Sequence, residues 1–102
     1  MEIRVGADEQ AVAASIGDVL VLALPENGAT GYQWHVAPHG AEVVVESDEL
    51  APPESAAPGA SGQRVITLRA ARAGTAKVDV RLQRAWESTA AEQRELLITV
   101  RA

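Results

Sequence analysis

The chain has 102 residues, enough to bury one hydrophobic core and too few for two, so we expect a single domain over residues 1–102. Its formal net charge of −5, without clustered Lys and Arg, argues against binding to nucleic acid or to anionic membranes. The absence of cysteine excludes disulfides, thiolate metal sites and a cysteine nucleophile.

The predicted core is aliphatic, because hydrophobic residues make up 47% of the chain but include only two Trp, one Tyr and no Phe. No apolar run approaches the roughly 20 residues that span a bilayer. Residues 1–4 lack the basic start and apolar stretch of a signal peptide, which favours a cytoplasmic location, while export after removal of a signal stays open. We expect a monomer without a cofactor.

Glycine, proline and polar clusters recur at short intervals between short apolar runs rich in Val and Leu, a pattern typical of an all-β domain. About seven to eight short strands predict a β-sandwich. The candidate strands, in chain order, are residues 3–5, 19–24, 32–36, 42–46, 64–70, 76–83 and 95–100.

Three segments need separate interpretation. Residues 8–17 are ambiguous, because Asp8 could cap one or two helical turns before Gly17. Residues 19–24 are apolar throughout and predict a central strand that ends at Pro25. Residues 47–63, rich in Pro, Gly and Ser and without a β-branched residue, predict a long loop.

The clearest period-2 pattern lies in residues 76–83, where apolar and polar side chains alternate. Continuing this pattern would point Arg84 into the core, and an unpaired buried guanidinium costs several kcal/mol. We therefore expect the strand to end or bend near Gln83 and to release residues 84–87 into a loop.

Histidine is the obvious candidate for metal chemistry, and the chain has only His35 and His39. A spacing of four residues would suit metal ligands on a helix, but Pro38 and the strand pattern around His35 argue against one, so we expect no metal site. No G-x-S-x-G nucleophile signature and no phosphate-binding glycine loop occurs, so we expect no catalytic residue and no enzyme.

The segment between Pro25 and Trp34, PENGATGYQW, is unusually rich in turn-forming and aromatic residues. Asn27-Gly28 alone is typical of a type I′ hairpin turn, which is the alternative to a functional role. The connection predicted between residues 24 and 32 is longer than such a turn. Its small side chains expose backbone amides and carbonyls, a shape suited to entering a cleft.

The two tryptophans are expected to differ. Trp34 lies on a predicted central strand, where a tryptophan is more often part of the core of an immunoglobulin-like sandwich than a contact residue. Trp86 lies beyond the predicted end of a strand, beside Arg84 and Glu87. Trp and Arg are enriched in binding hot spots, so Trp86 either contacts a partner or packs within its loop.

Three segments resemble, in the same order, the three signatures of the chagasin-like inhibitors of cysteine peptidases. GDVLVLALPENGATGYQW resembles the first, a strand followed by N-P-T-T-G-Y-x-W; PGASG resembles the glycine-rich second, G-x-G-G; and RLQRAWE resembles the third, R-P-W. The resemblance implies an immunoglobulin-like β-sandwich whose three loops form a wedge. In that family the wedge plugs the active-site cleft of papain-like peptidases.

The resemblance also implies which residues bind the peptidase. They are Asn27, Gly28, Ala29, Thr30, Gly31 and Tyr32 in the first loop, Gly59, Ala60, Ser61 and Gly62 in the second, and Arg84 and Trp86 in the third. The first loop would lie over the catalytic cysteine, and the other two would clamp either side. The expected function is reversible inhibition of a papain-like cysteine peptidase; the alternative is a protein-binding module that has lost this inhibition.

The chain departs from the family signatures at several positions. Gly28 and Ala85 replace prolines, Ala29 replaces a threonine, and Ser61 replaces a glycine. Each lost proline costs about 0.4 to 1 kcal/mol of loop rigidity, and the lost hydroxyl about 0.5 to 1.5 kcal/mol. The sum predicts binding roughly tenfold to a hundredfold weaker than with complete signatures.

Overall fold

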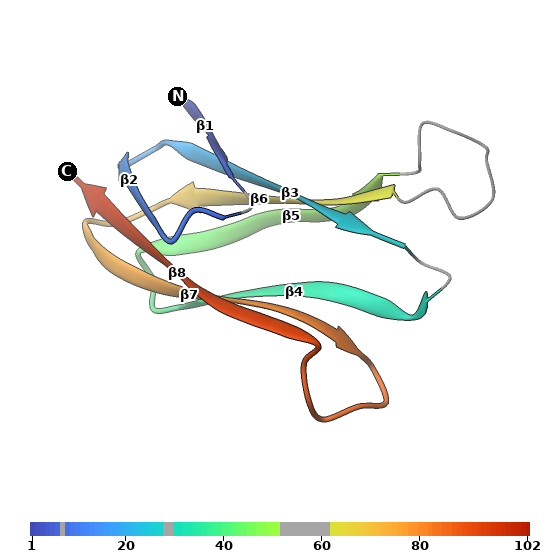
Figure 1. Cartoon of the computed structure of the whole chain (residues 1–102). Helices are drawn as coiled ribbons and strands as arrows, with labels where there is room; N and C mark the ends of the chain where they lie inside the picture. The colour runs from blue at the N-terminus through green and yellow to red at the C-terminus, as the bar shows by residue number, and fades with distance from the viewer. Residues whose placement is uncertain (7, 28–29, 52–61) are drawn as a thin grey trace.

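A computed structural model describes all residues except 7, 28–29 and 52–61. The described residues form eight strands in two four-stranded sheets that pack face to face (Figure 1). One sheet has the order β1 (Glu2–Val5), β3 (Val19–Glu26), β6 (Gly62–Ala70) and β5 (Val43–Ala51). The other has the order β2 (Ala11–Ser15), β8 (Glu92–Arg101), β7 (Gly74–Arg84) and β4 (Tyr32–His39). The predicted all-β sandwich is confirmed.

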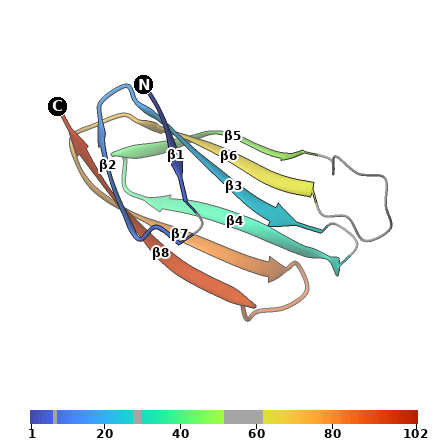
Figure 2. The same cartoon turned by 45° about the horizontal axis from the view of Figure 1, so that its top comes forward.

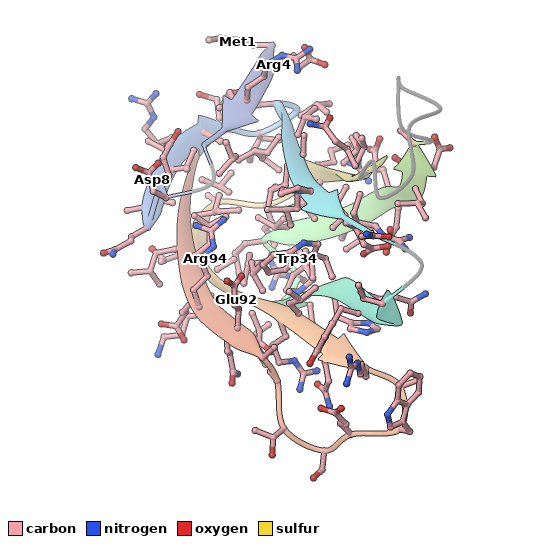
Figure 3. The ribbon with its side chains drawn as sticks, turned by 45° about the vertical axis from the view of Figure 1, so that its right-hand side comes forward. Met1, Arg4, Asp8, Trp34, Glu92 and Arg94 are labelled. Carbon is pink, nitrogen blue, oxygen red and sulfur yellow. The ribbon has the colours of Figure 1, made fainter. Side chains whose placement is uncertain are left out.

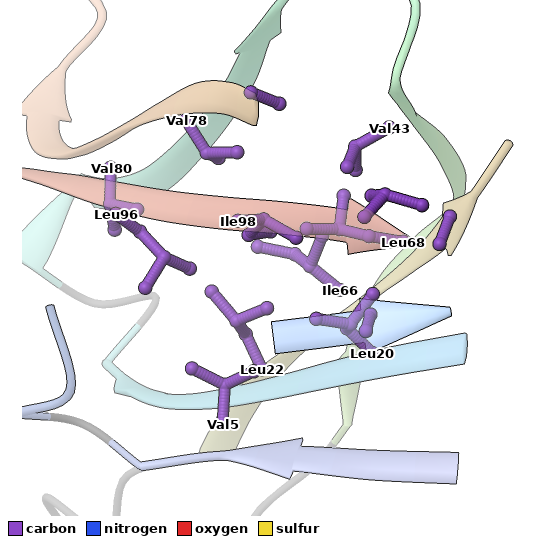
Figure 4. Close-up of a cluster of buried hydrophobic side chains, with 14 of the residues drawn as sticks. Val5, Leu20, Leu22, Val43, Ile66, Leu68, Val78, Val80, Leu96 and Ile98 are labelled. Atoms are coloured by element: carbon purple, nitrogen blue, oxygen red, sulfur yellow. The ribbon is translucent and has the colours of Figure 1, made fainter. Parts of the chain in front are cut away.

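The core is aliphatic, as the composition predicts, and lies between the two sheets (Figure 4). Every second residue of β3 and β7 points inward, because side chains alternate between the faces of a strand. The largest fully buried side chains are Leu20, Leu22, Val43, Ile66, Leu68, Val78, Val80, Leu96 and Ile98. Trp34 is also buried, which confirms its predicted place in the core.

The helical alternative for residues 8–17 is wrong, because Ala11–Ser15 form β2, which pairs in parallel with β8. Within β2, Val12 is half-buried and Ala14 is buried, so the segment has the period of a strand. The turn that follows is closed by Asp18, whose Oδ2 accepts the Ser15 N–H at 2.9 Å. Pairing with β8 therefore outweighs the local signal for a helix.

The loop predicted for residues 47–63 is too long at both ends. Residues 47–51 continue β5, and residues 62–63 begin β6, with which β5 pairs antiparallel. The register shifts between Val45 and Ser47, so one extra residue is accommodated there as a bulge. Hydrogen bonding to β6 thus extends a strand that its own residues do not favour; residues 52–61 lie outside the described part.

The predicted end of the strand at Pro25 is also wrong, since β3 runs on to Glu26. The N–H of Val19 points towards β1 and donates to the Met1 carbonyl at 2.9 Å. Pro25 lies six residues further along β3, so its nitrogen is on the same side of the strand. The last β3 residue that pairs with β1 is Leu22. Proline is tolerated at position 25 because no strand there requires its missing N–H.

The strand ends that flank three connections lie together at one end of the sandwich (Figures 1 and 2). We call this end the loop pole: it comprises the ends of β3, β5 and β7 and the beginnings of β4, β6 and β8. Both chain termini lie towards the other end (Figure 1). In the part of the chain that is described, no helix is long and apolar enough to cross a membrane.

Candidate functional site

The loop pole carries the described members of the predicted site, which are Asn27, Thr30, Gly31, Tyr32, Gly62, Arg84 and Trp86. The other predicted members, Gly28, Ala29, Gly59, Ala60 and Ser61, lie outside the described residues. Two of the three signature segments can therefore be followed in detail. They are the first, in its described residues Asn27 and Thr30–Tyr32, and the third, from Arg84 to Glu87.

The first segment is held by hydrogen bonds that centre on Thr30. Its N–H and its hydroxyl both donate to the Asn27 carbonyl, at 3.2 and 2.9 Å, and its Oγ1 accepts the Tyr32 N–H at 3.3 Å. No described residue other than glycine has a positive φ, so Asn27 does not adopt the conformation of a type I′ turn and that alternative is wrong. The connection between β3 and β4 is residues 27–31, shorter than predicted.

Arg84 joins the first segment to the third. It is the last residue of β7, one position beyond the predicted end, and its guanidinium carbon lies 4.1 Å from the centroid of the Tyr32 ring. Arg84 Nε donates to the Thr30 carbonyl at 3.1 Å, and Nη1 pairs with Glu87 at 3.1 Å. The guanidinium is thus partnered, and one-third of the Arg84 side chain remains exposed, which avoids the penalty for an unpaired buried charge.

Trp86 is the most exposed aromatic side chain in the described part of the chain, with 72% of its surface accessible. It also lies over Gly31, because a Cβ built on Gly31 would be only 2.6 Å from Trp86 Cη2. Trp86 therefore packs on a neighbouring loop and leaves most of its surface exposed, while its contact with a partner stays a prediction. Position 31 therefore requires glycine for two reasons. Its φ of +80° is rarely adopted by residues with a side chain, and a Cβ would collide with the Trp86 ring.

The Gly31→Ala variant is expected to displace Trp86. We compare it with Gly17→Ala, because Gly17 has a similar φ of +93° but nothing within 4 Å of a built Cβ. Both variants should lose about 1 to 2 kcal/mol of unfolding free energy from backbone strain. Only Gly31→Ala should change the emission and acrylamide quenching of the Trp86 fluorescence. Identical spectra for the two variants would contradict the contact.

A buried ion pair lies beneath the first segment. Glu26, the last residue of β3, is buried and accepts the Trp34 N–H at Oε1 (2.7 Å) and Arg64 Nη2 at Oε2 (2.6 Å). Burial by itself raises the pKa of Glu26, but the hydrogen bonds from Arg64 and from the Trp34 amide, with the charge of Arg64, hold that pKa below its usual value. Glu26 is therefore ionised at neutral pH.

Sequence reasoning missed Glu26, although the sequence contains a signal for it. Leu20, Leu22 and Leu24 point inward from β3, and Glu26 is the next residue in the same phase. A carboxylate that points inward from the strand requires a hydrogen-bond or charge partner inside the sandwich. Gly62, predicted in the second loop, is instead the buried first residue of β6 and pairs with Glu26 across the sheet.

A recess of about 380 Å³ lies between the end of β3, the start of β4 and the start of β8. Leu24 and Pro25 of β3, Trp34 of β4, and Glu92, Gln93 and Arg94 of β8 line it. Figure 3 shows Trp34 near Glu92 and Arg94. Neither histidine lines it, and the described residues contain no group of three His, Asp or Glu side chains placed to hold a metal ion. The recess therefore offers apolar contact and two charges of opposite sign.

The architecture and the loop pole define an immunoglobulin-like β-sandwich that presents connecting segments at one end. Residues 13–100 match the family described as Chagasin family peptidase inhibitor I42, so the chain belongs to this family. The family is one of peptidase inhibitors, not of enzymes. The family predicted from the sequence is thereby confirmed. No curated protein sequence matches this chain.

Several solved structures share the fold along nearly the whole chain. The cysteine protease inhibitor EhICP2 from Entamoeba histolytica has a TM-score of 0.82 and 18% identity, with 98% of this chain and 94% of that chain covered. The solution structure of Amebosin has a TM-score of 0.73 and 20% identity, with 99% and 97% covered. PbICP-C, solved in complex with falcipain-2, has a TM-score of 0.67 and 16% identity, with 98% of each chain covered. At these identities the likeness concerns the fold.

Proposed function

We propose that this protein is a reversible inhibitor of papain-like cysteine peptidases, and that its loop pole occludes their active-site cleft. The observation that carries the proposal is the cluster around Arg84, which joins the first and third signature segments into one surface. Membership of a peptidase-inhibitor family supports it. Two structures of the same fold support the class of target: one is named a cysteine protease inhibitor and one is bound to falcipain-2.

Inhibition of this kind requires shape and rigidity rather than reactive groups. The hydrogen bonds among Asn27, Thr30 and Tyr32, with the bond from Arg84 to the Thr30 carbonyl, restrict the described residues of the first segment before any partner arrives. A segment ordered in advance loses less entropy on binding. Trp86 projects from the same surface and offers a broad apolar contact to the rim of a cleft. Residues 27–32, 59–62, 84 and 86 are the proposed contact residues.

The proposal predicts that the folded protein inhibits papain or a cathepsin-like enzyme in a concentration-dependent way. Dilution of the complex should restore activity, because no covalent bond forms. Trypsin, a serine peptidase with a differently shaped site, serves as the control and should retain full activity. No inhibition of several papain-like enzymes at tens of micromolar, with folding verified by circular dichroism, would refute the proposal and favour a protein-binding module that does not inhibit.

A further inference from the structure

The carboxylate of Glu26 bonds to both sheets of the sandwich at the loop pole. Only 1% of its side chain is exposed, yet both oxygens are partnered. Oε1 accepts the Trp34 N–H at 2.7 Å and Arg64 Nε at 3.2 Å, while Oε2 accepts Arg64 Nη2 at 2.6 Å. Arg64 also reaches Asp48, with Nη1 at 3.0 Å from Oδ1. The result is a compact network that we call the Glu26 clasp, made of Glu26, Trp34, Asp48 and Arg64.

The four members lie on four different strands, each next to a connection at the loop pole. Glu26 is the residue before the first connection, and Trp34 is the third residue after it. Asp48 lies on β5, three residues before residue 51, and Arg64 is the third residue of β6. The backbone of Glu26 also pairs with Gly62. The clasp therefore links the strands on both sides of residues 27–31 to the strands on both sides of residues 52–61.

The bond to Trp34 crosses from one sheet to the other. Among the described strands, β4 is the outer strand of its sheet and pairs with β7 alone. Glu26 belongs to the opposite sheet and accepts the N–H of Trp34 directly. A second bond joins the same two strands, because Trp34 Nε1 donates to the Pro25 carbonyl at 2.9 Å. The two bonds together hold β3 and β4 in place where the first segment leaves β3 and enters β4.

Stability alone does not explain an ion pair at this position. Leu20, Leu22 and Leu24 precede Glu26 in the same inward phase, and an apolar residue would continue that series. Replacing both partners of a buried ion pair with apolar residues of similar size is often neutral or stabilising. A carboxylate, in contrast, accepts directional hydrogen bonds that fix the relative positions of its donors.

We propose that Glu26 is a positioning residue, which holds the first segment in its binding conformation and couples it to the strands that flank the second. This inference rests on the proposed function, because it assigns Glu26 to the same contact surface. The charged and titratable groups that face Glu26 are Arg64 from β6, Asp48 from β5 through Arg64, and His35 from β4. Burial raises the pKa of Glu26, but the hydrogen bonds from Arg64 and Trp34 and the charges of Arg64 and His35 lower it, so the carboxylate stays charged, which is the state that accepts all three bonds.

The test uses the double variant Glu26→Leu with Arg64→Met, which removes both charges together and leaves neither buried alone. We expect it to fold, with a melting temperature a few degrees below that of the parent, because the buried Trp34 N–H loses its acceptor. Its inhibition constant for papain should nevertheless rise at least tenfold. Glu46→Gln is the control, because Glu46 pairs with Arg69 on the exposed surface and its loss removes a carboxylate outside the clasp. The control should inhibit as the parent does.

Amide hydrogen exchange of the free protein gives a readout that needs no peptidase. In the double variant the N–H groups of Thr30 and Tyr32 should exchange at least tenfold faster than in the parent. The N–H of Leu97, bonded to Gln10 in the distant part of β8, should keep its parent rate. A purely structural role would leave both the exchange of the first segment and the inhibition unchanged once the double variant is stable.

The outcomes separate this inference from the proposed function. If the parent protein does not inhibit papain-like enzymes, the proposed function fails, while hydrogen exchange still decides whether Glu26 positions the first segment. Parent-like exchange at Thr30 and Tyr32 in the folded double variant overturns the positioning role. If the double variant does not fold, Glu26→Gln, which keeps the shape of the side chain, undergoes the same exchange and inhibition measurements with the same expected changes.

Discussion

The Trp34→Ala variant is expected to lose about 3 to 5 kcal/mol of unfolding free energy, which is the usual effect of removing a large buried aromatic side chain. Only 9% of Trp34 is exposed, and its indole Nε1 donates to the Pro25 carbonyl at 2.9 Å. The substitution would enlarge the recess that the indole lines and leave that carbonyl without its donor. Since domains of this size have total stabilities of about 5 to 15 kcal/mol, much of the protein should be unfolded near physiological temperature.

Urea denaturation followed by circular dichroism measures this effect. Trp34→Phe is the matched variant, because it keeps most of the buried ring and removes the indole N–H. It should lose about 1 to 2 kcal/mol, the range for a buried acceptor that has lost its hydrogen bond. If the alanine variant proves as stable as the phenylalanine variant, the packing of the Trp34 ring does not stabilise the core, and the role assigned to Trp34 is wrong.

The core could be predicted from the sequence because it depends on local alternation. In residues 76–83 the inward and outward positions follow from the order of the side chains alone, and the structure has the same phase. The burial of Trp34 follows from its place on a strand in the same way. Such patterns need no knowledge of which strands pair, and they indicate the fold class as soon as several of them occur in short succession.

The errors arise where pairing between distant residues outweighs local preference. Residues 47–51 contain none of the β-branched residues that favour strands, yet they extend β5 because β6 supplies hydrogen-bond partners. From the local sequence, Pro25 is expected to end the strand. Its nitrogen, however, lies beyond the last residue of β3 that pairs with β1, so no strand there needs a backbone N–H donor from residue 25. Residues 11–15 become a strand because β8 lies beside them. None of these partners can be identified from the neighbouring sequence.

In the candidate site, too, the sequence indicates which residues take part but not the contacts that depend on pairing between distant strands. The resemblance in the signatures placed Arg84 and Trp86 in one loop, but it did not indicate that Arg84 reaches the Thr30 carbonyl or that Trp86 rests on Gly31. These contacts join residues more than 50 positions apart, so they depend on the pairing of β4 with β7. Glu26 was overlooked because its acidic side chain, next to a turn, resembles an ordinary surface residue until the phase of β3 is followed to its end.

Removal of the Trp86 side chain is expected to affect binding rather than stability. Because 72% of the residue is exposed in the free protein, Trp86→Ala should shift the melting temperature by no more than about two degrees. Its affinity for a papain-like peptidase should fall about thirtyfold or more, which corresponds to about 2 kcal/mol and is typical of a tryptophan hot spot. Inhibition constants and thermal denaturation measured on the same samples test both parts.

Ile16→Ala is the matched control for Trp86→Ala. Ile16 is also a large exposed apolar residue, with 48% of its surface accessible, but it lies between β2 and β3, at the end of the sandwich away from the loop pole. Its removal should leave both stability and inhibition close to those of the parent. If Trp86→Ala inhibits as strongly as Ile16→Ala does, the exposed indole does not contact the peptidase. If it unfolds as readily as Trp34→Ala, the indole contributes to the fold, and its contact with Gly31 is the reason for its presence.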